Sequence, residues 1–169
     1  MGGDANYTEA IGLADDVIAY GDVTLESNFE DIFANGVANS EVIFARFTDN
    51  DQTSKSSFIY QTQQKVSTFL IDFLEGDPRA QHTYNESNDS MRKVYLASIS
   101  GGPTNYMRLA EVYLIKAECQ ARLNLLAEAE ATLNIVRDRA YGGTAPDLVY
   151  TGQQELLDLI FDEYIKELC

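Results

Sequence analysis

Carboxylates are the most abundant side chains in this sequence that could take part in catalysis, with 27 Asp and Glu residues among 169. Two carboxylates that face each other across a cleft could hydrolyse a glycosidic bond. With so many acids some pair always arises by chance, and nothing in the pattern sets one carboxylate apart. Glu111, Glu118 and Glu128 fall on polar helix faces, where they favour solubility and i,i+4 ion pairs. We therefore expect that the protein is not an enzyme.

Histidine and cysteine offer little catalytic or metal-binding chemistry. His82 is the single histidine and stands in a polar segment, so we expect it at the surface and not in a catalytic triad. Cys119 and Cys169 lie far apart without CxxC spacing, which argues against zinc. The stretch DNDQTSKSSFIY (49–60) begins like a calcium loop, but it lacks the required glycine and ends in Tyr60 where a bidentate Glu is needed. We predict no metal site and no cofactor.

The arginine and glutamate residues of the segment from 108 to 167 have two possible roles. The arginines are Arg108, Arg137 and Arg139. Their guanidinium groups could hold an anionic ligand through paired hydrogen bonds. They could equally form ion pairs across neighbouring helices and fix the packing of those helices. We favour the second interpretation, in which the candidate partners are Glu111, Glu163 and Glu167.

The segment GDPR (76–79) combines a glycine, a proline and two opposite charges. Asp before Pro is typical of a turn, because the Asp side chain can bond to the backbone two residues on. We predict a structural role for Asp77 and Arg79, with the arginine in a salt bridge.

The charge of the chain excludes some partners. The formal net charge is −15, and no Lys or Arg precedes Arg46. Binding to a phosphate backbone needs a basic face that releases counterions, so we expect no nucleic-acid partner. Docking onto anionic lipid is disfavoured for the same reason.

The elements that must position these residues begin with a helix over 5–20. Ala10, Ala14 and Val17 form its apolar stripe, and Gly21 ends it. The sequence pattern after this helix predicts short elements only. These are a helical turn at 29–33, a strand at 41–47, a loop at 48–57, a helix at 63–76, and irregular chain at 79–104 with an extended piece at 93–98.

Residues 105–140 predict an antiparallel helical hairpin, interrupted near Asn124. Small and apolar residues recur in both helices at helical spacing. Four of them keep the spacing of a tetratricopeptide repeat, in which small residues let two helices approach closely. These four are Tyr113, Ala117, Ala129 and Leu133.

Residues 151–168 predict a further helix, opened by a capping box of Thr151 and Gln154. We interpret it as the first helix of a truncated repeat, and 5–20 as the second helix of another. The expected organisation is a single partial domain over 1–169. It is mainly α, with tetratricopeptide-like hairpins of an α-α superhelix, a loop-rich insertion at 21–104, and a short β element.

The hairpin sequence resembles one known family closely. RLAEVYLIKAE (108–118) and AEAEATLNIVRDRA (127–140) are similar to the signature of the SusD/RagB family of outer-membrane nutrient-binding lipoproteins. NFEDIF, NSEVIFARF and GDPR resemble the landmarks that precede this signature. The matching hairpin positions are Arg108, Ala110, Glu111, Tyr113, Leu114, Ala117, Glu118, Leu133, Asn134, Val136, Arg137, Arg139 and Ala140.

The last landmark departs from the family pattern. An E-R-R-x-E-L segment is usual there, and this chain has Glu163, Glu167 and Leu168 but Tyr164 and Ile165 in place of the two arginines. Nearly all of this chain takes part in the resemblance. It corresponds to a minority of a full-length member, so we expect the lipoprotein signal, earlier repeats and the carboxy-terminal part to lie outside it.

The resemblance implies a helical scaffold whose long loops bind glycans without cleaving them. It also implies a place at the cell surface and outer membrane, and delivery of oligosaccharide to a SusC-like TonB-dependent transporter. Membrane association would occur only through a lipid anchor absent from this chain.

Sugar binding requires aromatic faces, framed by amide and carboxylate hydrogen bonds. The chain has no Trp but ten Tyr residues. Loops on a rigid scaffold are where binding residues concentrate. The same rings could instead pack the loop onto the helices. The candidates in the loop-rich segment are Phe58, Tyr60, Tyr84 and Tyr95, with Gln61 and Asn85 beside two of them.

A second hypothesis is a tetratricopeptide-type scaffold for protein–protein interaction with no role in sugar binding. Peptide binding in the groove would favour it.

Overall fold

A computed structural model describes residues 3–34, 39–46, 65–93 and 104–169. The chain divides into two compact units. We call Met1–Leu25 together with Arg108–Cys169 the helical unit, and Glu26–Met107 the mixed unit. Of the helices in the described ranges, none combines the length and the apolar character needed to cross a membrane.

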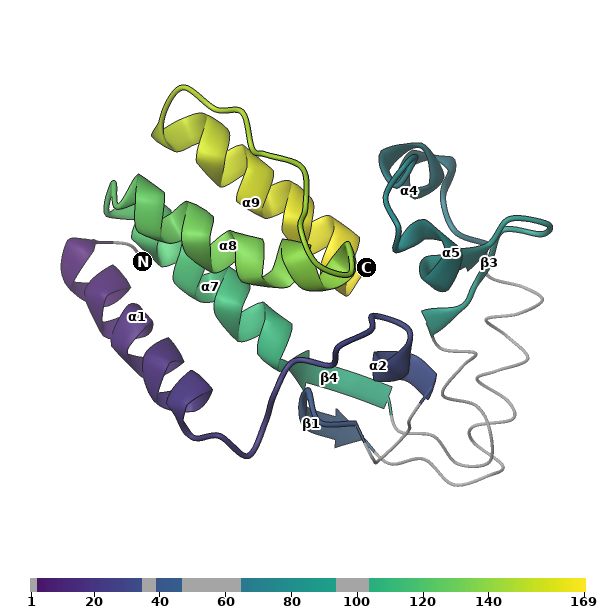
Figure 1. Cartoon of the computed structure of the whole chain (residues 1–169), viewed down its shortest axis with the longest axis horizontal. Helices are drawn as coiled ribbons and strands as arrows, with labels where there is room; N and C mark the ends of the chain where they lie inside the picture. Colours follow the sequence, from purple (N-terminus) through teal and green to yellow (C-terminus); the bar gives the residue numbers. More distant parts are fainter. Residues whose placement is uncertain (1–2, 35–38, 47–64, 94–103) are drawn as a thin grey trace. The chain divides into compact units, whose positions relative to one another are not determined.

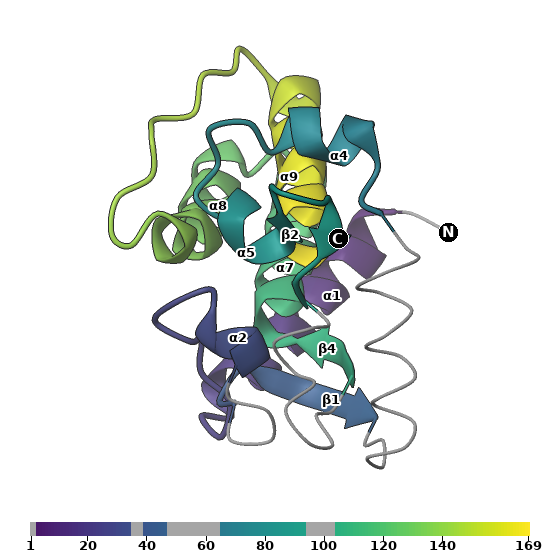
Figure 2. The ribbon, with the colours of Figure 1, turned by 90° about the vertical axis from the view of Figure 1, so that its right-hand side faces the viewer.

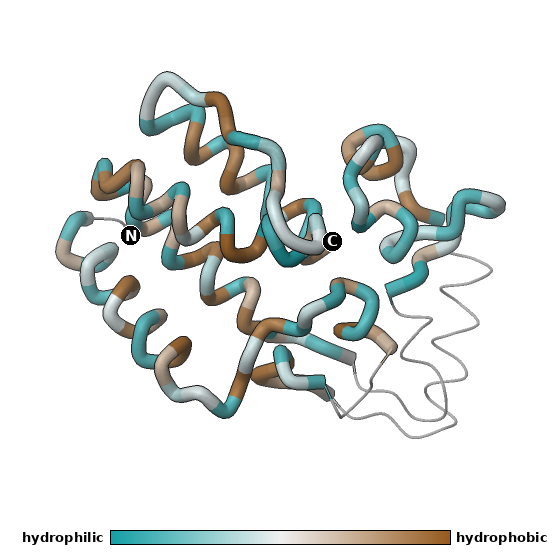
Figure 3. Tube along the Cα trace, viewed as in Figure 1, coloured by the Kyte–Doolittle hydropathy of each residue, from teal (hydrophilic) through white to brown (hydrophobic). Residues whose placement is uncertain are grey.

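The helical unit contains α1 (Asp4–Ala19), α7 (Leu109–Arg122), α8 (Leu126–Ala140) and α9 (Gln153–Leu168). Helix α7 lies at its centre and packs on the other three helices (Figures 1 and 2). Helices α7 and α8 run antiparallel, as the hairpin pattern predicts (Figure 1). Hydrophobic and hydrophilic residues alternate along α7, α8 and α9 (Figure 3), as expected for helices with one buried face.

Small side chains bring the helices of this unit together. Ala117 and Ala121 of α7 and Ala129 of α8 are fully buried. Without bulk at these positions two helix backbones can approach closely, and the larger side chains fill the remaining space. The core is Ala110, Leu114, Ala117, Ala121, Ala129, Leu133, Val136, Leu156 and Ile160. The predicted mainly α fold with tetratricopeptide-like hairpins is confirmed.

The turn of the hairpin explains the break near Asn124. This residue has φ 61°, a left-handed conformation that Asn adopts more readily than most residues. The Leu125 N–H donates to the Gln120 carbonyl at 2.9 Å, and the Asn124 N–H donates to the Ala121 carbonyl at 2.9 Å. These two bonds form a Schellman motif, which satisfies the last carbonyls of α7 and turns the chain into α8.

The capping box predicted at the start of α9 paired Thr151 with Gln154, and this partner is wrong. The N–H and hydroxyl of Thr151 donate to Glu155 Oε2 at 2.6 and 2.9 Å. Gln154 instead donates from its side chain to Asp158 at 2.9 Å. The physical reason is that the helix begins at Gln153, so Glu155 and not Gln154 reaches back over the first turn.

The mixed unit is built from short elements. Strand β1 (Val42–Arg46) pairs with β4 (Thr104–Arg108), and β2 (Tyr84–Asn85) pairs antiparallel with β3 (Ser90–Met91). Its helices are α2 (Asp31–Ala34), α4 (Thr68–Phe73) and α5 (Ala80–Thr83). Phe29, Ile32 and Phe33 form a small buried cluster.

Two predicted boundaries in this region are wrong. The helix expected from 105 begins at Leu109, because residues 104–108 form β4 and pair with β1, a partner distant in sequence. The helix expected over 63–76 is limited to α4, since the Ser67 hydroxyl caps it by accepting from the Leu70 N–H at 3.3 Å. Most of the extended piece at 93–98 lies outside the described residues.

Candidate functional site

The predicted sugar-binding residues fall mostly outside the described part of the chain. Phe58, Tyr60, Gln61 and Tyr95 are among the residues that it does not include. The remaining two, Tyr84 and Asn85, form strand β2.

Both residues of β2 take part in the packing of the mixed unit. Tyr84 is buried, with 7% of its surface exposed. Its ring therefore contributes to packing, which is the alternative to sugar contact given for these aromatic residues. Asn85 Oδ1 accepts from the N–H and hydroxyl of Ser87 at 3.0 and 2.8 Å. These bonds shape the turn between β2 and β3.

Asp77 and Arg79 form a compact buried ion pair. The guanidinium donates from Nε to Asp77 Oδ1 and from Nη2 to Oδ2, both at 2.9 Å. The Arg79 N–H also donates to Oδ1 at 3.0 Å. Arg79 is fully buried, so the pair holds the turn before α5 and presents no group to a ligand.

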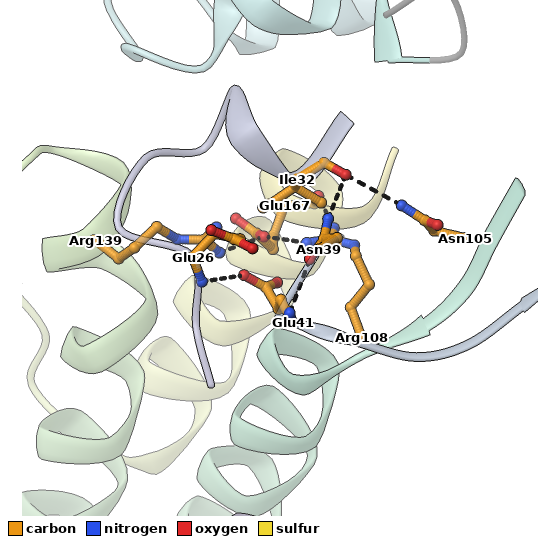
Figure 4. Close-up of polar contacts among 8 residues, drawn as sticks. All are labelled: Glu26, Ile32, Asn39, Glu41, Asn105, Arg108, Arg139 and Glu167. Atoms are coloured by element: carbon orange, nitrogen blue, oxygen red, sulfur yellow. Dashed lines mark hydrogen bonds and ion pairs between the residues drawn. The ribbon is translucent and has the colours of Figure 1, made fainter. Parts of the chain in front are cut away.

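A second buried ion-pair cluster joins three helices of the helical unit (Figure 4). Glu167 Oε1 accepts from Arg108 Nη1 at 2.8 Å and from Arg139 Nη2 at 2.6 Å. Arg108 Nη2 also donates to the Glu167 carbonyl at 2.7 Å. The cluster therefore ties the last turn of α9 to the start of α7 and the end of α8.

Arg137, which is also predicted for this network, contacts different groups. Arg137 donates to Asn134 Oδ1 at 2.5 Å and to the Pro146 carbonyl at 2.7 Å, so it fixes the chain that leaves α8. Glu163 is buried and Glu111 is half-buried. Glu167 contacts both Arg108 and Arg139.

Polar contacts in the mixed unit hold the chain before β1 (Figure 4). Asn39 Nδ2 donates to the Ile32 carbonyl at 2.5 Å, and Asn39 Oδ1 accepts from the Glu41 N–H at 2.8 Å. Glu41 Oε2 accepts from the Glu26 N–H at 3.1 Å, and Asn105 Nδ2 donates to the Ile32 carbonyl at 3.3 Å. The bond from Asn39 to the N–H two residues on is an Asx turn, a local signal that the sequence analysis did not use.

Strands β1 and β4 carry an exposed aromatic pair. Phe44 is 57% exposed and Tyr106 is 56% exposed, with 6.0 Å between ring centroids. The sequence does not predict this pair, because its pattern places Tyr106 in a helix and Phe44 in a separate strand. Exposed neighbouring rings are uncommon and mark a candidate contact surface.

A pocket of about 160 Å³ lies between α7 and α9. Helix α7 contributes two charged side chains, Glu118 and Arg122. Helix α9 supplies aromatic, apolar and polar groups. They are Gln154, Leu157, Asp158, Ile160, Phe161 and Tyr164. The lining thus combines an aromatic surface with groups that donate and accept hydrogen bonds.

One wall of this pocket is an ordered polar network. Arg122 Nε donates to Glu118 Oε1 at 2.8 Å, and the Tyr7 ring of α1 lies 5.7 Å from the Arg122 guanidinium carbon. Burial, followed by the negative charges of Glu118 and Glu111, raises the pKa of Tyr164. Tyr164 stands where the family pattern has an arginine, and Arg122 supplies the cation for Glu118 in this chain.

Comparison with known proteins identifies the family. The SusD family profile matches residues 27–169. Among solved structures, a SusD superfamily protein from Parabacteroides distasonis superposes with TM-score 0.78 at 17% identity, over 99% of this chain and 45% of that one. A SusD-like carbohydrate binding protein from Bacteroides vulgatus has TM-score 0.71 at 24% identity, over 97% of this chain and 39% of that one.

A surface glycan-binding protein A from Bacteroides uniformis has TM-score 0.70 at 17% identity, over 97% of this chain and 43% of that one. The chain thus spans less than half the length of each of these three proteins. None of the curated proteins matches it. The structural likenesses establish the shared fold, and the profile match spans most of the sequence. The chain belongs to the SusD family.

Proposed function

We propose that this chain is part of a glycan-binding protein that captures oligosaccharides at the bacterial cell surface without cleaving them. The observation that carries the proposal is the match of the SusD family profile over residues 27–169. Two structural relatives, a carbohydrate binding protein and a surface glycan-binding protein, agree with it.

The described residues are suited to binding. Helix α7 and its neighbours form a scaffold with a buried apolar core, on which exposed groups can be held in place. Exposed aromatic rings occur on both units, with Phe44 and Tyr106 on the strands and Phe161 on α9. Phe58, Tyr60, Gln61, Tyr84, Asn85 and Tyr95 stay proposals for glycan contact.

Binding without catalysis is supported by two buried carboxylates, those of Glu167 and Asp77. Glu167 is engaged by two arginines and Asp77 by one, so each is held as a charged partner in an ion pair. A general acid for glycoside hydrolysis needs a raised pKa, which a neighbouring guanidinium opposes.

In this proposal the full-length protein is held at the outer membrane by a lipid anchor. It passes its oligosaccharide to a SusC-like TonB-dependent transporter. Co-purification of that transporter with the full-length protein from detergent-solubilised outer membranes tests the partner. Recovery of the protein without any transporter would contradict it.

The glycan-binding proposal is tested by electrophoresis of the full-length protein through gels that contain one polysaccharide each. We expect retarded migration in at least one gel of a panel of neutral and acidic polysaccharides, with no release of reducing sugar. Equal mobility in every gel would overturn glycan binding. Release of sugar by the purified protein would overturn the non-catalytic part.

A tetratricopeptide-type interaction scaffold is the second candidate, favoured by the close packing of α7 on α8 through Ala117 and Ala129. It predicts a peptide or protein ligand in place of a glycan. Co-purification of a stoichiometric protein partner, together with no retardation in any polysaccharide gel, would favour it over the first proposal.

A further inference from the structure

We propose that the pocket between α7 and α9 is a binding subsite for one uncharged sugar ring of a glycan. The proposal rests on the glycan-binding function proposed above and names one place and one ligand class for it. The residues that carry it are an aromatic ring at the rim, a polar pair beside that ring, and an ordered charged wall.

Phe161 supplies the stacking surface. Its side chain is 66% exposed although it belongs to the pocket lining. An exposed aromatic face attracts the C–H groups on the apolar face of a pyranose ring, and such burial is favourable for both partners. Ile160, one residue before it, is buried in the helical core, so the backbone that carries Phe161 is held in place.

Gln154 and Asp158 supply hydrogen bonds to sugar hydroxyl groups. They lie one turn apart on α9, and Gln154 Nε2 donates to Asp158 Oδ1 at 2.9 Å. A carboxylate has about four acceptor positions, so Asp158 retains acceptor capacity for hydroxyl donors. Each oxygen of a sugar hydroxyl both donates and accepts, and this pair offers the two complementary kinds of group.

The α7 side of the pocket is preorganised. Arg122 is held between the Glu118 carboxylate, at 2.7 Å from its Nη2, and the Tyr7 ring of α1. A guanidinium fixed in this way can donate to a ligand oxygen with little further loss of side-chain freedom. Two helices of one unit, α7 and α1, therefore define this wall.

The charge of the lining selects against anionic sugars. Glu118 and Asp158 carry two negative charges, and Arg122 carries the positive charge. Because Glu118 already neutralises Arg122, the uncompensated charge is that of Asp158. A uronic or sialic acid carboxylate placed beside Asp158 would be repelled, whereas a neutral ring would not.

The size of the pocket limits what it can hold. Sites for drug-sized ligands occupy about 300–1,000 Å³. The α7–α9 pocket, at about 160 Å³, is smaller than this range. It therefore accommodates one ring, and the rest of a glycan would extend into solvent.

The test uses the full-length protein and the polysaccharide gels described above. Phe161→Ala should weaken retardation by the bound neutral polysaccharide roughly tenfold, the loss expected for one aromatic contact. Phe161→Tyr should retain it, because the stacking face is preserved. The matched control is Phe69→Ala, since Phe69 is 64% exposed but lies on α4, stacked on Phe73.

A second variant tests the ligand class. Asp158→Asn preserves shape and removes the uncompensated charge, so it should raise the affinity for acidic polysaccharides relative to neutral ones. Far-ultraviolet circular dichroism and the melting temperature confirm that each variant is folded.

The outcomes separate the two proposals. If the unmodified protein binds a neutral polysaccharide and Phe161→Ala binds it equally well, the subsite is overturned and the glycan-binding function stands. Binding of acidic polysaccharides alone overturns the assignment to an uncharged ring. No retardation in any gel overturns the proposed function, and the subsite with it.

Discussion

Two arginine–glutamate networks in the helical unit use the same chemistry in opposite environments. In the Glu167 cluster the side chains of Arg108, Arg139 and Glu167 are 7%, 5% and 0% exposed. In the pocket wall the side chains of Arg122 and Glu118 are 41% and 34% exposed. The first network is sealed against water, and the second is open to it.

The difference in exposure assigns different roles to the two networks. Charges removed from water are stable only while every partner is present, so the Glu167 cluster makes the junction of three helices depend on each member. An exposed pair contributes little to stability, because water screens and competes for it. The pocket wall can therefore exchange contacts with a ligand, which the Glu167 cluster cannot do without unfolding its surroundings.

Removal of Glu167 should produce the largest effect on stability. Glu167→Ala leaves Arg108 and Arg139 without their shared carboxylate in a buried place, which should cost about 3–5 kcal/mol of unfolding free energy. Urea denaturation measures the change. Glu128→Ala is the control, because it removes an exposed glutamate of α8. Equal midpoints for the two variants would contradict a structural role for the cluster.

Truncation of the pocket pair should produce a smaller effect. In a double-mutant cycle of Glu118→Ala and Arg122→Ala, the coupling free energy should stay below about 1 kcal/mol, because the pair is solvent-exposed. The measurement is again urea denaturation, for the two single variants and the double variant. A coupling as large as the effect of Glu167→Ala would remove the contrast between the two networks.

The smallest expected effect concerns the pH dependence of stability. Burial and the charges of Glu118 and Glu111 raise the folded-state pKa of Tyr164 above 10.0, its ordinary value. A raised pKa means that the folded state retains the proton more strongly. The stabilisation is therefore complete below about pH 10 and is lost as the pH rises towards the folded-state pKa.

Tyr164→Phe should accordingly flatten the decline in unfolding free energy above about pH 10, because it removes the ionisable hydroxyl. Tyr20→Phe is the matched control, since Tyr20 is 74% exposed. Urea midpoints between pH 8 and 11 provide the comparison. Parallel curves for the unmodified protein and Tyr164→Phe would show that Tyr164 lies in a different environment from the one described.

The parts of the fold that sequence analysis predicted are those with local causes. The spacing of Ala117, Ala121 and Ala129 indicates close-packed helices, because helical periodicity depends only on neighbours in the chain. Strand β4 was missed, because Thr104–Arg108 is extended through its pairing with β1, and no local pattern specifies that partner. Similarly, Thr151 donates to Glu155 and not to Gln154, because the helix begins one residue later than the pattern indicates.

The same distinction applies to the candidate site. Aromatic residues in the loop-rich segment were chosen by residue type, and the buried position of Tyr84 in β2 depends on the packing of the mixed unit. The exposed pair of Phe44 and Tyr106 could not be predicted, because two strands distant in sequence bring the rings together. The pocket was equally unpredictable, because helices α7 and α9 are separate in the sequence and only their packing brings the lining residues together.

The sequence by itself determined the helical periodicity, the small residues at the hairpin contact, the acidic charge and the resemblance to the SusD family. Each of these depends on residue type and on short-range spacing. The tertiary structure alone decided which glutamate pairs with Arg108 and Arg139, which rings remain exposed, and where α7 and α9 leave a pocket. Those features depend on contacts between residues far apart in the chain, and burial sets their energies.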